Sequence, residues 1–390
     1  MKKKWLALFS VMLAYSFAFL TRYIYSPLMG DMSKSLNMTS TKAGLLMTGF
    51  MVGYILMQLP GGLLADRLVV RRILIADMIV SGIATAFLSS VNTFAAALVL
   101  RVIIGLACGS IYSCCSKVIA HYFEKKELSV AMGILLATAP AGIMLANSAG
   151  EAVAQSQGWR KTFLFTAVIS LLAVICLLLF VEDFREENRK SSVEGLLGGI
   201  KAFISDKQQI ILGMSGFMLM FETVGFAHWT NVYLEEGIGM PGETAGLILT
   251  AYSVSGIVFS SLSGTIARKL KANPRRFIIV CEILMLITTV GFAFCRSQAA
   301  FITVGILCGA FTYLPSTHYV TLAMARSQPQ NIGTTAAFQN LVFQCGGLVQ
   351  SALIGVLIDS FHSYSLIWIA FTVSCVLEIL LVALFREKEA

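Results

Sequence analysis

Charged residues are scarce in this sequence. Only 13% of the 390 residues are Asp, Glu, Lys or Arg, whereas 57% are hydrophobic. An ordinary soluble domain has about 25% charged residues, and a water-soluble fold of this length could not hide so much apolar surface. We therefore expect an integral membrane protein, in which the lipid bilayer replaces water around most apolar side chains.

The signatures of most enzymes are also missing. The sequence has no CxxC pair among its nine cysteines, no glycine-rich nucleotide loop, no His, Cys and Asp cluster, and no polar stretch long enough for a soluble catalytic domain. We expect no enzymatic activity, no cofactor and no metal site. The nine cysteines lie in apolar stretches, where they act as small hydrophobic residues.

Twelve apolar stretches are present, each long enough for a membrane-spanning helix, which needs roughly 20 residues. They are continuous and do not alternate over about 10 residues as barrel strands would. The predicted spans are residues 6–29, 43–64, 73–91, 94–116, 128–150, 161–181, 209–234, 244–266, 277–295, 299–323, 332–358 and 364–385.

The basic residues are distributed unevenly between the connections. On the side of the two termini lie 22 of the 29 Lys and Arg. The positive-inside rule then predicts a multi-pass protein of the cell membrane with both termini in the cytoplasm. The net charge of +8 follows mostly from this bias, so we expect no nucleic-acid partner.

The chain repeats itself at an offset of 202 residues. An Ala-Gly-Leu sequence at 43–45 begins a span that ends near Gly62, and the same sequence at 245–247 begins one that ends near Gly264. Two six-helix halves are therefore expected, joined by a charged cytoplasmic linker that is flexible or forms a surface helix. The predicted parts are an N-terminal bundle 1–181, a linker 182–208 and a C-terminal bundle 209–390.

The connection after the second span carries a family motif. Its residues Gly62, Leu64, Ala65, Asp66, Arg67 and Arg71 resemble the G-x-L-a-D-R-x-G-R-R loop of the major facilitator superfamily, with departures at Val69 and Val70. The resemblance implies an all-α membrane protein of twelve transmembrane helices in two pseudo-symmetric six-helix bundles, working by alternating access. It also implies a gating role for Gly62, Asp66, Arg67 and Arg71, with Asp66 against the start of helix 11 near 332–334.

The fourth span contains a charge. Arg101, Gly105 and Gly109 follow one another at four-residue spacing, and the glycines allow another helix to approach closely. A charge inside the bilayer is costly unless it faces a cavity or a partner. Arg101 is therefore either a substrate-binding residue or a paired structural ion.

The first span contains a second buried charge. Arg22 shares a helix face with Tyr15, Tyr25 and Ser26, and a guanidinium group suits carboxylate or phosphate. These residues predict an anion-binding site. The candidate substrate-binding residues of the first half are Arg22, Tyr25, Tyr54, Gln58, Arg101 and Tyr112.

Within the superfamily, the chain resembles the branch of anion and organophosphate symporters and exchangers. Arg22-Tyr23, Tyr54, the Gln58–Gly62 sequence and the Trp229–Leu234 end of helix 7 carry this resemblance. Where the phosphate-ester exchangers have a second arginine before the tryptophan, this chain has Thr223. The resemblance therefore implies a monocarboxylate or another weakly charged solute.

Acidic and amide residues of the second half are further candidates. Glu222 is expected to carry the coupling proton, to pair with a cationic substrate, or to be a hydrogen-bonded structural acid. Asp77, Glu282 and Glu378 fall near predicted cytoplasmic helix ends, and we expect them at the membrane interface. The candidate substrate-binding residues of the second half are Trp229, Asn340 and Gln344, of which the two amides line a cavity or bond to a neighbouring helix.

Together these features predict a secondary transporter for a small, monocarboxylate-like organic anion. We expect a monomer in the lipid bilayer that couples transport to protons or to a counter-substrate, with the two halves rocking around Arg22, Arg101 and Glu222. One alternative is an efflux carrier for amphipathic or cationic compounds, although the fifth span lacks the glycine-rich pattern of drug antiporters. Another is a membrane sensor that has a carrier fold and transports nothing.

Overall fold

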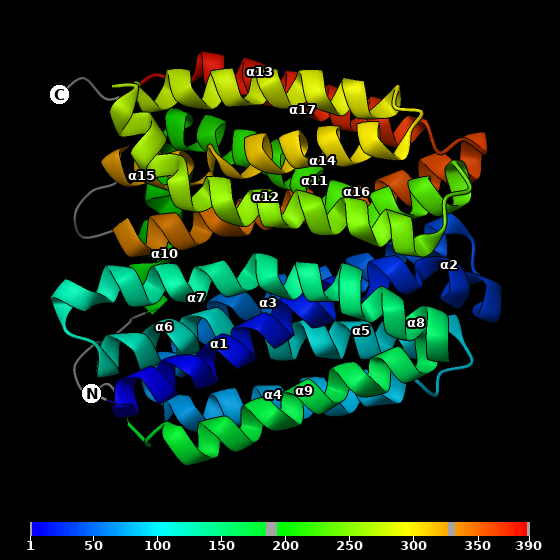
Figure 1. Cartoon of the computed structure of the whole chain (residues 1–390). Coiled ribbons are helices and arrows are strands. Elements are labelled where there is room, and N and C mark those ends of the chain that lie inside the picture. The colour runs from blue at the N-terminus through cyan, green and yellow to red at the C-terminus, as the bar shows by residue number, and fades with distance from the viewer. Residues whose placement is uncertain (1, 185–192, 327–331, 388–390) are drawn as a thin grey trace. The chain divides into compact units, whose positions relative to one another are not determined.

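The computed structural model describes residues 2–184, 193–326 and 332–387, and every regular element in these ranges is helical (Figure 1). The chain divides into two compact units, residues 1–190 and 191–390, which are described separately. The range predicted as a linker, 182–208, contains the helix α10 (Val193–Ser205), which contacts α16 (Ile332–Phe361).

Unit 1 contains nine α-helices and one π-helical turn among its described residues. Its first predicted span is interrupted at Ile24, where Pro27 provides no N–H group for the Tyr23 carbonyl. The elements are α1 (Lys2–Tyr23), α2 (Tyr25–Leu36), α3 (Ser40–Arg67), α4 (Val70–Leu88), α5 (Phe94–Cys108), α6 (Ile111–Tyr122), α7 (Lys125–Leu145), η1 (Ala146–Gly150), α8 (Glu151–Gln157) and α9 (Trp159–Phe180).

Unit 2 repeats this arrangement after α10. Its tenth predicted span is also divided in two, at Leu314 and Pro315. The elements that follow α10 are α11 (Lys207–Val232), the π-helical turn η2 (Tyr233–Gly237), α12 (Gly242–Lys269), α13 (Pro274–Ala293), α14 (Gln298–Tyr313), α15 (Ser316–Arg326), α16 and α17 (Leu366–Leu384).

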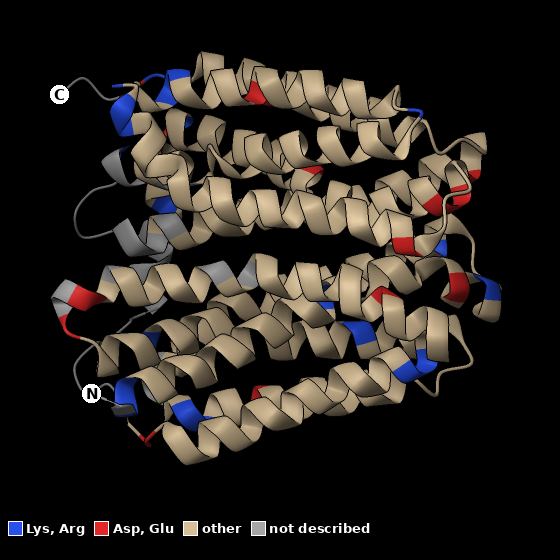
Figure 2. Cartoon of the chain, in the orientation of Figure 1, with Lys and Arg blue, Asp and Glu red and all other residues tan. Residues whose placement is uncertain are grey.

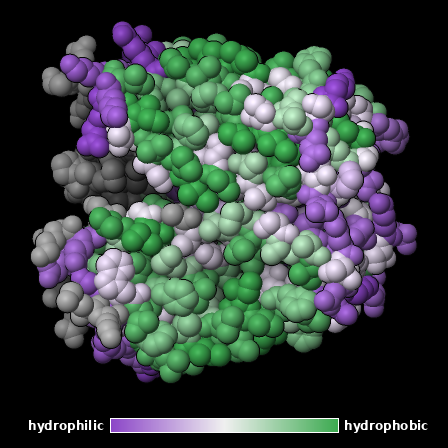
Figure 3. Space-filling view, in the orientation of Figure 1, coloured by the Kyte–Doolittle hydropathy of each residue, from purple (hydrophilic) through white to green (hydrophobic). Residues whose placement is uncertain are grey.

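The helices have the length and surface expected in a bilayer. Ten helical stretches of the described chain are long and apolar enough to cross a membrane, and α14 is a shorter apolar helix. The remaining predicted span is α4. Figure 2 shows most charged residues near the helix ends, and Figure 3 shows hydrophobic residues over the middle of the helices on the face in view.

Corresponding helices of the two sequence repeats make the same kind of close contact in both units. A Cβ atom at Gly105 would overlap the carbonyl oxygen of Phe50, where α5 crosses α3. A Cβ atom at Gly309 would overlap the carbonyl oxygen of Tyr252, where α14 crosses α12. Phe50 and Tyr252 are separated by the offset of the repeat, so each unit uses a glycine to bring the same pair of helices together.

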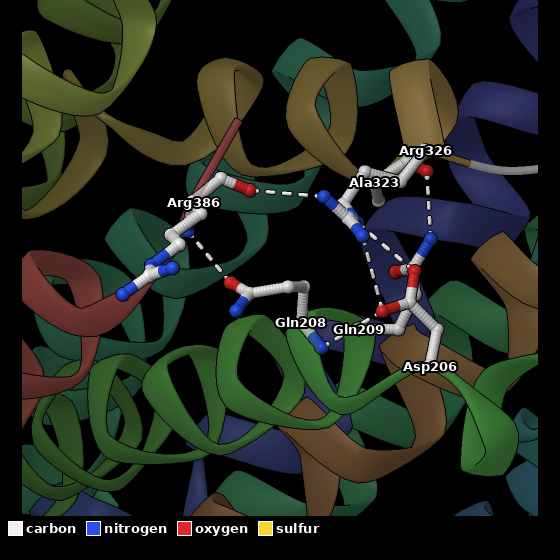
Figure 4. A network of polar contacts seen from close by, with 6 residues as sticks. All are labelled: Asp206, Gln208, Gln209, Ala323, Arg326 and Arg386. Carbon is white, nitrogen blue, oxygen red and sulfur yellow. Dashed lines mark hydrogen bonds and ion pairs between the residues drawn. The ribbon is translucent and has the colours of Figure 1, made fainter. Parts of the chain in front are cut away.

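Ion pairs fasten helix ends in both units. In unit 1, Arg71 lies 2.6 Å from an Asp183 oxygen and donates a 3.0 Å hydrogen bond to the Val181 carbonyl, which joins α4 to the end of α9. In unit 2, Asp206 pairs with Arg326 at 2.9 Å, and Arg326 donates to the Arg386 carbonyl (Figure 4). These contacts join α11, α15 and the residues after α17.

Asp206 is also the N-cap of α11. Its carboxylate accepts a 2.9 Å hydrogen bond from the Gln208 backbone, next to the pair with Arg326. Burial raises the pKa of Asp206, but the hydrogen bonds from Arg326 and Gln208 outweigh burial, and the pKa lies below its usual value. The charged form of Asp206 therefore stabilises this end of unit 2.

Candidate functional site

Each nitrogen of the Arg101 guanidinium donates a hydrogen bond to a backbone carbonyl. Its guanidinium is 1% exposed and donates to the carbonyl oxygens of Thr21 at 3.0 Å, Leu46 at 3.2 Å and Arg22 at 3.4 Å. The rings of Tyr25 and Phe50 lie 5.2 and 4.9 Å from the guanidinium carbon. The sequence left two roles for Arg101, a substrate-binding residue or a paired structural ion. The carbonyl groups and rings around its guanidinium favour the second role.

Arg22 has the opposite surroundings. Its side chain is 4% exposed, yet no described residue forms a hydrogen bond or an ion pair with its guanidinium, and its Nε atom is buried without a partner. The rings of Tyr23 and Tyr54 lie 5.2 and 5.9 Å from the guanidinium carbon. A buried guanidinium without a carboxylate can accept a negative ligand.

Arg101 positions Arg22 through the backbone. The carbonyl groups of Thr21 and Arg22 lie just before the interruption between α1 and α2, and Arg101 of α5 donates to both. The end of α1 is thereby tied to α5. The orientation of Arg22 then depends on a rigid backbone and not on a partner of its own side chain.

The tyrosines predicted for this site divide into two groups. The ring of Tyr112 lies 5.8 Å from that of Tyr15, and the ring of Tyr54 is the one 5.9 Å from Arg22. Tyr25 instead donates a 3.2 Å hydrogen bond to the Ala43 carbonyl and packs against Arg101, because the helix is interrupted before it. The expected face that joins Tyr25 to Arg22 is therefore not formed.

Gln58 completes the polar residues near Tyr54. It lies one turn after Tyr54 on α3, and its amide oxygen is buried without a hydrogen-bond partner. An amide with a free buried atom is able to bond to a polar ligand. Tyr23 was not among the predicted binding residues, although its place next to Arg22 in the sequence was a usable signal for the ring contact that the structure shows.

Glu222 of unit 2 faces α13 and α17. It is 1% exposed and accepts 2.7 Å hydrogen bonds from the Thr289 hydroxyl and from the Cys375 thiol. Glu282 and Glu378 lie beside it, and one oxygen of each of the three carboxyl groups is within 4.8 Å of the others. Neither Glu282 nor Glu378 was expected in contact with Glu222.

The predicted interfacial position of three acids was wrong. Glu282 and Glu378 are 0% exposed, and Asp77 is 8% exposed and accepts a hydrogen bond from Ser110. All three point into their own unit. Their positions near the predicted helix ends suggested contact with water. Exposure depends instead on whether a side chain faces the neighbouring helices, and these three do.

The other candidates of unit 2 do not form one described group. Trp229 is fully buried with its indole nitrogen unpaired, Gln344 is half-buried with an unpaired amide oxygen, and Asn340 is exposed. Thr223 donates its hydroxyl to the Leu219 carbonyl of its own helix at 2.7 Å. The roles predicted for Trp229, Asn340 and Gln344 stay predictions.

The gating residues are only partly described. The side chains of Asp66 and Arg67, and those of 332–334 opposite which Asp66 was expected, lie outside the described residues. Arg71 forms the ion pair with Asp183 that joins α4 to the end of α9. Gly62 is half-buried, and a Cβ atom there would lie 3.8 Å from the Ser113 hydroxyl oxygen, which leaves room for a small side chain.

Comparison with known proteins identifies the family. The family model of the Major Facilitator Superfamily matches residues 11–351. This chain belongs to the Major Facilitator Superfamily. It is therefore a secondary transporter of the membrane and not an enzyme, as the sequence predicted.

Individual members of the superfamily are distant in sequence. The hexuronate transporter of Bacillus subtilis (strain 168) is 20% identical over 346 residues, which cover 85% of this chain and 82% of the relative. The cis,cis-muconate transport protein of Acinetobacter baylyi is 25% identical and covers 68% and 67%. A bacterial homologue of the human lysosomal transporter Spinster, solved in an inward-facing form, has a TM-score of 0.85 at 16% identity and covers 100% and 99%. This structure shares the fold.

Proposed function

We propose that this member of the superfamily transports a small organic anion with one carboxylate-like charge, and that Arg22 binds the negative group. The observation that carries the proposal is the unpaired guanidinium of Arg22, buried beside Tyr23 and Tyr54. A cation in such a place is costly without a counter-charge. An anionic solute would supply that charge while it is bound.

The number of cations argues for a weakly charged solute. Among the described residues only Arg22 and Arg101 are buried cations, and Arg101 already donates to three carbonyl groups. One available guanidinium matches one carboxylate better than a doubly charged phosphate ester. The relatives named for hexuronate and for cis,cis-muconate support organic acid anions as the broader class, although muconate has two carboxylates and hexuronate one.

A binding panel tests the class of solute. Purified protein is heated with hexuronates, other monocarboxylates, dicarboxylates, sulfonates, phosphate esters and organic cations, since a ligand of the folded state raises the melting temperature. We expect the largest rise with a monocarboxylate. The largest rise with an organic cation would favour an efflux carrier, and a ligand that binds but is never transported would favour a sensor.

Arg22→Lys tests the binding group. Lysine keeps the charge but loses the planar pair of donors, so we expect uptake into vesicles to fall more than tenfold while the melting temperature without ligand is unchanged. Arg160→Lys is the matched control, because Arg160 donates hydrogen bonds to Ser89, Val91 and Asn92 after α4 and lies over the ring of its neighbour Trp159. Near-normal uptake by Arg22→Ala would contradict the assignment.

Glu222 is the residue that we propose for coupling to protons. It is buried within α11, and its two hydrogen bonds come from neutral groups, so its carboxyl is able to take up and release a proton. Exchange of one solute for another remains the alternative mode of transport.

A further inference from the structure

Three glutamates meet in the interior of unit 2. Glu222 comes from α11, Glu282 from α13 and Glu378 from α17, and one oxygen of each lies within 4.8 Å of the others. None is more than 1% exposed. Each lies at least six residues, or about 9 Å, from the nearer end of its helix. The cluster is therefore enclosed by helices and does not belong to a helix end.

The three carboxyl groups are unequally satisfied. Glu222 accepts from Thr289 and Cys375, and Glu378 accepts from the Tyr319 hydroxyl through one oxygen. Both oxygens of Glu282 and the second oxygen of Glu378 are buried without a hydrogen-bond donor. A buried acceptor without a partner costs about 1–3 kcal/mol, and more if it is charged. Glu282 is thus a fully buried polar side chain that points into the cluster, where no described hydroxyl, thiol or N–H group bonds to it and the carboxyl group of Glu378 lies within hydrogen-bonding reach.

No protein cation compensates these groups. In residues 193–326 and 332–387, no described Lys or Arg is buried, and none of the ion pairs involves the three glutamates. The surrounding titratable groups are Tyr252 of α12, Cys281 of α13, Cys308 of α14, Tyr319 of α15 and Cys375 of α17. The three carboxyl groups can be ionised together in this interior only if a metal ion compensates their charge, and otherwise they hold protons.

We propose that Glu222, Glu282 and Glu378 form a binding site for a hard metal cation, such as Na⁺ or Ca²⁺, which exchanges with protons held by the carboxyl groups. Carboxylate oxygens are the ligands that hard cations prefer, at about 2.3–2.6 Å for Ca²⁺. Oxygens on opposite sides of such an ion are then about 5 Å apart. The observed separation of at most 4.8 Å allows one oxygen of each glutamate to reach the same ion.

The exchange balances in charge. A carboxyl group binds a metal only after it loses its proton, so Na⁺ entering the site releases one proton and Ca²⁺ releases two. The charge of the enclosed cluster is the same before and after exchange. This balance removes the main obstacle to a metal ion in an apolar interior, because no additional charge is buried.

The site goes beyond the proposed transport of an anion, and its test needs no organic solute. The purified full-length chain is titrated with NaCl or CaCl₂ against choline chloride of equal ionic strength. We expect a saturable rise in melting temperature with a hard cation, together with proton release measured by an indicator dye in weak buffer. Failure of the Arg22 experiments would leave this result unaffected.

Single substitutions locate the site. Glu282→Gln keeps the shape and removes one carboxylate of the cluster, so we expect cation binding at least tenfold weaker and no proton release. Glu378→Gln is the second variant if Glu282→Gln does not fold. Glu151→Gln is the matched control, a buried glutamate of unit 1 that is bonded to Gln155 and should leave cation binding unchanged.

Cys375→Ser tests the kind of metal. Serine replaces the thiol beside Glu222 by an oxygen, so binding of Na⁺ or Ca²⁺ should be retained. The proposal is overturned if no hard cation gives a saturable rise, if the rise survives in the glutamine variants of the cluster, or if the cluster binds only protons.

Discussion

The two units differ in the charged side chains that they bury: the described buried arginines lie in unit 1, together with Asp77 and Glu151, whereas the described buried charges of unit 2 are all glutamates. Unit 1 buries the guanidinium groups of Arg22 and Arg101, on α1 and α5. Unit 2 buries Glu222 and its two neighbouring glutamates, and none of its described Lys or Arg is buried. The helix contacts at Gly105 and Gly309 nevertheless repeat. A repeated backbone therefore carries two buried arginines in one half and a cluster of three buried glutamates in the other.

The largest expected effect distinguishes the two buried arginines of unit 1, which are each replaced by methionine. Arg101→Met removes donors from three buried carbonyl groups, and we expect the free energy of unfolding to fall by about 3 kcal/mol. Arg22→Met removes no hydrogen bond and should leave stability the same or higher. Denaturation of both variants in detergent measures the difference. Equal losses of stability would show that Arg22 is structural too.

Glu222→Gln examines the acidic half. Glutamine resembles the protonated carboxyl group, so exchange of solute across a vesicle membrane should stay within about twofold of the wild type, while accumulation driven by a pH gradient falls more than tenfold. Uptake of labelled solute with and without the gradient measures both. Glu151→Gln is again the control. Accumulation that persists in Glu222→Gln would assign coupling to another residue.

The smallest effect concerns the clamps at the helix ends. Asp206→Asn loses the charged pair with Arg326 and should lower stability by about 1 kcal/mol. Because folding lowers the pKa of Asp206, this contribution is complete above the usual aspartate pKa of about 4 and disappears as the pH falls through the lowered value. Thermal melting between pH 3 and 7 should therefore show that the wild type and the variant converge at the acidic end.

Asp183→Asn is the equivalent change in unit 1, where Asp183 pairs with both Arg71 and Arg72. We expect a smaller loss, since Arg72 is largely exposed and an exposed pair contributes little. A larger loss for Asp183→Asn than for Asp206→Asn would reverse this part of the comparison.

The fold was predictable because long apolar runs leave few choices. Backbone groups in lipid must be bonded within their own segment, so the spans had to be helices. The motif from Gly62 to Arg71 and the offset of 202 residues then indicated the superfamily, which the family match to residues 11–351 confirms. Pro315 indicated a hinge in the tenth span, where the helix is divided, but the interruption at Ile24 was not predicted, although Pro27 was a visible signal.

The site was predictable only in its residue types. A charge inside a span marks a residue that needs a partner or a cavity, and this reasoning selected Arg22, Arg101 and Glu222. The same reasoning applied to Glu282 and Glu378, but we predicted contact with water for both because they lie near predicted helix ends. Charged residues inside apolar spans are better considered together, because they can contact one another in the fold.

The sequence by itself determined that this protein is a helical membrane transporter of two repeated halves, because composition, apolar length and the repeat are properties of the chain alone. Only the tertiary structure decided that Arg101 is bonded and Arg22 is not, and that three glutamates share one interior. The physical reason is that a buried charge is stabilised by atoms from other helices. In unit 2, Glu222 and Glu378 are 156 positions apart in the sequence, and only folding brings their side chains together.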